Sequence, residues 1–192
     1  MSKVESTFMN MVVTLLVVTL VASSALGFVY ALTKEPIEAA KLAKRMRAII
    51  EVLPEYDNDP FAESYKIPVE GDTLYFYPGK MNDELIGTAV ETVSSKGFSG
   101  DIKLMVGLLP DGTINDITVL EHKETPGLGD KMDKKKSDFS LQFQGKNPED
   151  FKISVTKDGG EIEAITASTI SSRAFCEAVV TAYNVYMEGG KK

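Results

Sequence analysis

The chain has 192 residues, 43% of them hydrophobic, which is enough for one compact domain and one additional segment. A formal net charge of −7 argues against nucleic acid as a partner, because binding a phosphate backbone requires a basic surface. Cys176 is the only cysteine and His122 the only histidine, so there is no intrachain disulfide and no Cys/His cluster for metal or thiol chemistry. We expect proteins or small molecules as partners, no bound metal, and Cys176 as a small core residue.

Residues 8–32 carry no charge and are rich in Val, Leu and Ala. As a helix they would be about 37 Å long, against about 30 Å for the hydrocarbon core of a bilayer. The pattern predicts a transmembrane helix over 8–32 in contact with lipid, after a short tail over 1–7 and before a domain over 33–192. A signal peptide is the alternative, since ASSA offers small residues, although the apolar run is longer than a signal peptide requires.

The charges that flank this segment leave its orientation open. Lys3 precedes it, whereas five basic residues follow it: Lys34, Lys41, Lys44, Arg45 and Arg47. By the positive-inside rule the domain would lie in the cytoplasm. The rule is weak for a long domain, which is translocated largely regardless of its charge, and Glu35 and Glu38 balance part of the basic charge.

An amphipathic helix is predicted next, starting near Pro36, which suits a first helical turn, and ending before Pro54. Its apolar stripe would consist of Leu42, Met46, Ile49 or Ile50, and Leu53. Between about residues 65 and 165 the pattern favours strands, with turns at Pro-Asp-Gly 110–112 and Asp-Gly-Gly 158–160. The expected strands are 72–78, 84–94, 101–109, 113–122, 151–156 and 161–166.

Because these strands follow one another and helices stand only at the two ends, the chain is expected to be α+β, with antiparallel strands joined as hairpins. The basic run at 133–136 is expected to be a solvated loop. The segment EHKETPGLGDK, residues 121–131, interrupts the strands with one proline and two glycines. It is either a long surface turn or a loop whose glycines let the backbone approach a flat ligand.

The segment ITASTISSRAF, residues 165–175, places five hydroxyl side chains between Thr166 and Ser172. An apolar stripe of helical spacing follows them: Ala174, Phe175, Ala178, Val179, Ala182, Tyr183 and Tyr186. The hydroxyls therefore stand at a helix N-terminus, where Ser and Thr act as caps and where an anion such as phosphate is favoured. Both interpretations remain open from the residues alone, and Arg173 would lie one turn inside the helix.

In these segments the chain resembles the FMN-binding domain family. The resemblance covers the N-terminal span, GFSGDIKLMVGLLPDG, ETPGLGD and DGGEIEAITASTISSRA. It is greatest to the G subunits of Rnf-type ferredoxin:NAD oxidoreductases, and next to the C subunits of sodium-pumping NADH:quinone reductases. In these families a Ser/Thr-Gly-Ala-Thr run carries FMN as a phosphoester of the threonine. The aligned acceptor is Thr169, with Ala167 in place of the usual glycine and Ser168 in place of the usual alanine.

The resemblance implies an electron-transfer subunit of a membrane complex that couples ferredoxin:NAD electron transfer to ion translocation. It also implies partner redox subunits, a soluble domain on the outer face of the cytoplasmic membrane, and a separate flavin transferase. The transferase is needed because a threonine hydroxyl is a poor nucleophile and no base is evident beside it. The implied FMN-binding residues are Thr169 with Thr166, Ser168, Ser171, Ser172 and Arg173 at the phosphate, and Glu124, Thr125, Leu128 and Gly129 at the flavin.

Two alternatives remain at this point. One is the C subunit of a sodium-pumping quinone reductase, and the other is a membrane-anchored interaction or assembly module without flavin, in which the hydroxyls only cap a helix. In each case the chain would be part of a larger assembly, with no catalytic residue of its own.

Overall fold

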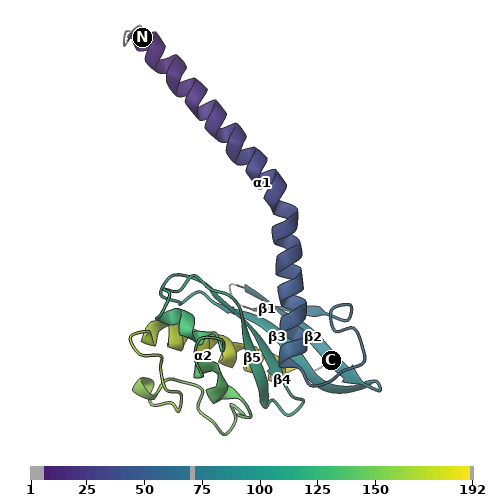
Figure 1. Cartoon of the computed structure of the whole chain (residues 1–192). Coiled ribbons are helices and arrows are strands. Elements are labelled where there is room, and N and C mark those ends of the chain that lie inside the picture. The colour runs from purple at the N-terminus through teal and green to yellow at the C-terminus, as the bar shows by residue number, and fades with distance from the viewer. Residues whose placement is uncertain (1–6, 70–71, 191–192) are drawn as a thin grey trace. The chain divides into compact units, whose positions relative to one another are not determined.

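The computed structural model describes residues 7–69 and 72–190. The chain divides into two compact units, Met1–Ala43 and Lys44–Lys192. The described part of the first unit is helical from residue 8 onward, and the second unit contains a five-stranded sheet and the C-terminal helix (Figure 1).

A single helix, α1 (Phe8–Val52), covers both segments for which separate helices were predicted. Pro36 lies inside this helix, so the predicted helix start there is wrong. Proline removes one backbone hydrogen bond, but strong helix formers such as Ala and Leu on both sides allow the helix to continue. All side chains of residues 8–32 are exposed, and the helix is long and apolar enough to cross a membrane. Its end at Val52 agrees with the prediction.

The sheet is antiparallel, with strand order β1-β2-β3-β4-β5. Its strands are β1 (Tyr65–Val69), β2 (Asp72–Met81), β3 (Glu84–Ser94), β4 (Ile102–Leu108) and β5 (Ile114–Glu121). Strands that are neighbours in the chain are neighbours in the sheet, which confirms the predicted α+β class with hairpin connections. Four predicted strands correspond to β2 through β5, whereas β1 lies outside the predicted segments.

Each face of the sheet carries its own hydrophobic core, because side chains alternate along a strand. Phe76, Val90 and Leu104 face the C-terminal helix α2 (Thr169–Val185). On the opposite face, Tyr77, Ala89 and Met105 pack against the end of α1. The buried residues there are Ala48, Ile49 and Val52, together with Leu53 directly after the helix. The end of α1 approaches β4 so closely that a Cβ at Gly107 would overlap the carbonyl group of Val52.

The predicted stripe on the second half of α1 is only partly confirmed. Ile49 and Leu53 are buried, but Leu42, Met46 and Ile50 are 40%, 49% and 64% exposed. The buried face of α1 is therefore confined to the turns that contact the sheet. An ion pair holds these turns in place, since Arg45 Nη2 donates to Glu91 Oε1 on β3 at 3.0 Å.

The chain between β5 and α2 buries apolar side chains without forming strands. It contains three 3₁₀ helices, η1 (Gly129–Met132), η2 (Phe139–Phe143) and η3 (Thr156–Asp158). The strands predicted over 151–156 and 161–166 are wrong, because these segments share only one parallel bridge, between Val155 and Ile162. Their alternating apolar residues Ile153, Val155, Ile162 and Ile165 instead enter the core from a loop. Short-range bonds such as Ile162 N to Ser154 O, 3.0 Å, satisfy the backbone.

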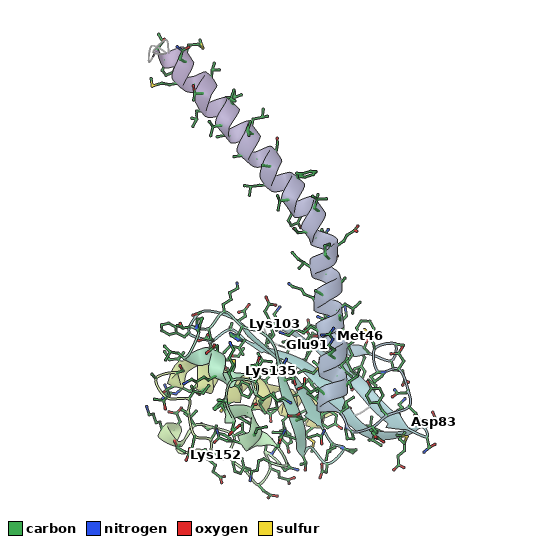
Figure 2. The ribbon with its side chains drawn as sticks, viewed as in Figure 1. Met46, Asp83, Glu91, Lys103, Lys135 and Lys152 are labelled. Atoms are coloured by element: carbon green, nitrogen blue, oxygen red, sulfur yellow. The ribbon has the colours of Figure 1, made fainter. Side chains whose placement is uncertain are left out.

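The basic run at 133–136 is more than the solvated loop that was predicted. Lys134 Nζ lies 3.1 Å from Glu51 Oε1 at the end of α1 and 2.5 Å from Asp116 Oδ2 on β5. Lys136 Nζ lies 2.7 Å from Asp130 Oδ2. Lys135 is exposed between them (Figure 2). Two of these lysines therefore hold the loop to the domain, and the third points to solvent.

Helix α2 confirms the predicted final helix. Its first residue is Thr169, and it continues beyond Val185 into a π turn, Tyr186–Gly190. Of the predicted stripe, Ala174, Phe175, Ala178, Val179, Ala182 and Tyr186 are buried and Tyr183 is half-buried. The stripe fixes which side of α2 faces the sheet, and so determines which hydroxyls at its start point inward.

Candidate functional site

The chain makes a tight turn directly before α2. Ser168 N donates to Ile165 O at 2.9 Å, and Ala167 adopts the left-handed conformation with φ of 60°. Ser168 occupies the N-cap position, yet its side chain makes no capping hydrogen bond. The structure thus shows no capping role for Ser168.

The hydroxyl groups divide into an inner and an outer set. Ser172 is fully buried, and its Oγ accepts from Ile165 N and donates to Ser168 O, both at 3.0 Å. Ser171 is also buried, and its Oγ donates to Glu124 Oε2 at 2.6 Å. Thr166 is exposed, and Thr169 is partly exposed. The inner serines stabilise the turn, which leaves Thr169 as a hydroxyl accessible at the start of the helix.

Glu124 joins three separate segments of the chain. It is only 5% exposed, and besides the bond from Ser171 it accepts from Ser99 N at 3.0 Å through Oε1. A Cβ at Gly129 would lie 2.6 Å from Glu124 Oε2 and 2.7 Å from Ser171 Oγ, so only glycine permits this contact. The loop before β4, the loop after β5 and the start of α2 are therefore held together by one buried carboxylate.

These three segments enclose an open cavity of about 320 Å³, within the size range of small-molecule sites. Seven residues predicted from the sequence line it: Glu124, Thr125, Leu128, Gly129, Ser168, Thr169 and Ser171. The remaining lining residues are Phe98, Ala167 and Ile170. Thr166 and Ser172 are not among them, since Thr166 points to solvent and Ser172 lies beneath the turn.

Arg173 does not line the cavity. Its Nε and Nη2 each lie 2.7 Å from an oxygen of Asp158, on the loop that contains η3. These hydrogen bonds hold the pKa of Asp158 below its ordinary value, so the carboxylate stays charged at neutral pH and the pair is lost only when the pH falls through that lowered pKa. The cation beside Thr169 is instead Lys157, whose Nζ lies 3.4 Å from Thr169 Oγ1.

Cys176 lies one turn further along α2 and is 3% exposed. Burial raises the pKa of its thiol to about 12, which makes the thiolate inaccessible at physiological pH. The predicted role of Cys176 as a small core residue is confirmed.

Sequence reasoning missed three residues of this region: Phe98, Ile170 and Lys157. Phe98 is 67% exposed and stands between Gly97 and Gly100, a pattern that could have marked it as an aromatic side chain held at the surface. Ile170 is 48% exposed at the start of an otherwise buried stripe. Nothing in the sequence near Lys157 distinguishes it from other surface lysines.

The left-handed Ala167 leads to a testable expectation for stability. Ala167→Gly should raise the free energy of unfolding by about 0.5 kcal/mol, because relief of a strained alanine, about 1 kcal/mol, exceeds the added entropy of an unfolded glycine. Ala164→Gly is the matched control, since Ala164 has no positive φ and should only lose stability. Thermal unfolding of the two variants in detergent measures the difference, and a lower midpoint for Ala167→Gly would contradict it.

Residues 97–184 match the family of the FMN-binding domain. Every residue that lines the cavity falls within this stretch. So do β4, β5 and all of α2 except its last residue, Val185. The second unit of the chain therefore contains a match to the FMN-binding domain family that includes the whole cavity lining.

Relatives similar over most of the chain are each named as the G subunit of an ion-translocating oxidoreductase complex. The protein of Vibrio cholerae serotype O1 strain M66-2 is 34% identical over 171 residues, 83% of this chain and 80% of that protein. The protein of Vibrio atlanticus strain LGP32 is 35% identical over 85% of this chain and 84% of its own length. That of Haemophilus influenzae strain PittEE is 36% identical over 76% and 74%, respectively. The chain belongs to this family, the G subunits of ion-translocating oxidoreductase complexes.

Proposed function

We propose that this protein is the FMN-carrying electron-transfer subunit of a membrane-bound Rnf-type complex that couples ferredoxin:NAD electron transfer to ion translocation. The observation that carries the proposal is the cavity, in which the hydroxyl-bearing start of α2 meets the 124–129 loop. Membership of the G-subunit family supports the assignment to such a complex. FMN, when bound, supplies the capacity to accept and release electrons.

The lining of the cavity fits a flat aromatic group. Phe98, Leu128 and Ile170 are 67%, 40% and 48% exposed, so a sizeable apolar surface around the cavity is not covered by the protein itself. Burying such surface is favourable at about 25 cal/mol per Å². Thr125 and Ser168 provide polar groups at the same cavity. The apolar residues would hold the flavin ring, and the start of α2 would hold its phosphate.

Thr169 would carry the FMN as a phosphoester. Its Oγ1 is partly exposed at the cavity, and the neighbouring group in hydrogen-bond range is the Lys157 amine. An ammonium group donates hydrogen bonds and cannot take the hydroxyl proton, so this contact offers no base to activate the threonine. Attachment would accordingly need a separate flavin transferase, with this chain as its substrate.

The membrane helix and the family membership suggest how the protein is placed in the membrane and what it contacts there. Residues 8–32 would cross the cytoplasmic membrane once, in contact with lipid and with other subunits of the complex. The FMN-binding domain, taken as residues 33–192, would lie on the extracytoplasmic side. The length and apolar composition of the helix over residues 8–32 support a retained anchor, because the segment is long enough to cross a bilayer.

Intact-mass analysis of the chain purified from its native host tests the proposal. The expected mass exceeds that of the chain by FMN less one water, and the band fluoresces under ultraviolet light after denaturing electrophoresis. If the chain from cells that contain a competent transferase carries no flavin, the electron-carrier function is wrong. The protein would then be a membrane-anchored interaction module.

The proposed orientation predicts the labelling of an engineered cysteine. Lys135→Cys in a Cys176→Ser background places one thiol on an exposed loop position (Figure 2). We expect it to react with a membrane-impermeant maleimide in intact cells whose outer layers admit the reagent. Labelling that requires lysis of the cytoplasmic membrane would place the domain in the cytoplasm. The Cys176→Ser parent without the added cysteine gives the background.

A charge at the apolar side of the cavity should disturb the bound flavin. Leu128→Asp is expected to shift the flavin absorption and lower its reduction potential, because a carboxylate near the ring disfavours added electrons, while the covalent bond stays intact. Leu128→Asn is the matched control without the charge. Spectroelectrochemical titration measures both variants. If the spectrum and potential of Leu128→Asp equal those of wild type, the 124–129 loop is not part of the flavin site.

A further inference from the structure

The contact between Lys157 and Thr169 places a positive charge that forms no salt bridge within the described residues beside the proposed attachment oxygen. Lys157 Nζ lies 3.4 Å from Thr169 Oγ1. Across residues 7–69 and 72–190, no carboxylate lies within ion-pairing distance of Lys157, although the whole chain has a net charge of −7. Acidic residues are thus in excess, yet this cation faces a neutral hydroxyl.

The neighbouring residue explains how Lys157 is held there. Thr169 and Arg173 are four residues apart, so they lie on the same side of α2. Lys157 and Asp158 are consecutive in η3, and they contact Thr169 and Arg173 respectively. The two hydrogen bonds of 2.7 Å between Arg173 and Asp158 form a bidentate pair, which fixes orientation as well as distance.

The backbone of this loop is constrained as well. Asp158 N donates to Val155 O at 2.8 Å, and Gly159 adopts the left-handed conformation with φ of 74°. A Cβ at Gly160 would overlap the carbonyl group of Ser154. The loop is therefore closed on itself and attached to α2 by the Arg173–Asp158 pair, with Lys157 directed at the start of the helix.

We propose that Lys157 is the counter-cation of the FMN phosphodiester on Thr169, and that Arg173 is a positioning residue that acts through Asp158. This rests on the proposed attachment of FMN. With FAD as donor, Thr169 Oγ1 gives its proton to a base of the transferase and bonds to the phosphorus on the flavin side, and AMP leaves with the bridging oxygen. The product carries one negative charge next to Thr169 Oγ1, the atom that Lys157 contacts, so Lys157 gains an anion in ion-pairing range.

The first measurement is the initial rate of FMN incorporation into the full-length chain in detergent, with a flavin transferase and FAD. We expect Lys157→Met to slow incorporation about fivefold, the effect of one partly exposed charge pair. Lys157→Arg should restore most of the rate. Arg173→Gln should slow it by a similar factor although Lys157 is intact. Lys152→Met is the matched control, an exposed lysine of the same region that should leave the rate unchanged (Figure 2).

The second measurement excludes an effect on transferase recognition alone. In the loaded proteins, the ³¹P NMR signal of the phosphodiester should shift in Lys157→Met and in the same direction in Arg173→Gln, and match wild type in Lys152→Met. A signal in Lys157→Met equal to that of wild type would overturn the role of Lys157, even if loading is slower. An unshifted signal in Arg173→Gln would overturn the positioning role.

The two proposals fail in different ways. Wild-type chain that takes up no FMN on Thr169 would overturn the proposed function, and the role of Lys157 with it. A different result would overturn only the role of Lys157. In that case the wild-type chain is loaded on Thr169, and Lys157→Met behaves as Lys152→Met in both measurements.

Discussion

Replacing Thr169 with alanine is expected to give a folded, membrane-inserted protein that carries no covalent FMN and does not support electron transfer through its complex. The substitution removes the hydroxyl oxygen that the cavity presents for a phosphoester. Its structural cost should be small, about 0.5 kcal/mol, because Thr169 is partly exposed and the hydrogen bond between its hydroxyl and Lys157 is long, 3.4 Å.

Intact mass and in-gel flavin fluorescence check this result, with thermal unfolding as the control for folding. Thr169→Ser keeps a hydroxyl at the same place and should retain part of the modification. Thr166→Ala is the matched control, since Thr166 belongs to the same run but lies outside the cavity lining. Flavin found on Thr166, Ser168 or Ser171 would show that the attachment residue is misassigned while the family assignment stands.

Replacing Glu124 with alanine is expected to cause the largest loss of stability, about 3 kcal/mol. The buried carboxylate accepts from Ser171 Oγ and Ser99 N, and hydrogen bonds to charged groups contribute about 1.5–3 kcal/mol each. Its removal leaves the Ser99 N–H without this partner and releases the contact between the 97–100 loop and α2. We also expect weaker retention of the flavin ring in loaded protein, because the three cavity-forming segments are no longer held together.

Glu124→Gln is the matched variant for this prediction. Its carboxamide oxygen still accepts from Ser99 N, and its amide group can donate to Ser171 Oγ, so about half of the loss should be recovered. A double-mutant cycle of Glu124→Ala with Ser171→Ala, measured by thermal unfolding in detergent, gives the coupling between the two side chains. Equal stability of Glu124→Ala and wild type would show that this carboxylate does not hold the cavity together.

The sequence by itself determined the features that depend on near neighbours in the chain. The uncharged run of 8–32 is an exposed apolar helix because length and hydropathy are local properties. Strands β2 through β5 follow from period-two alternation between turn residues, and α2 follows from the three-and-four spacing of its buried residues. The resemblance of two short segments to the FMN-binding domain family also supplied seven of the cavity residues.

The tertiary structure alone decided which segments meet. Alternating apolar residues at 151–156 and 161–166 indicate that one side of each segment is buried. A strand also needs a neighbouring strand to complete its backbone hydrogen bonds, and these two segments share a single bridge. Arg173 is close to Thr169 in sequence, yet it binds Asp158, and the cation at Thr169 is Lys157 from twelve residues earlier. Phe98 and Glu124 reach the start of α2 from loops before β4 and after β5. Such contacts depend on how the sheet brings distant loops to the same end of its strands, which no local pattern of residues encodes.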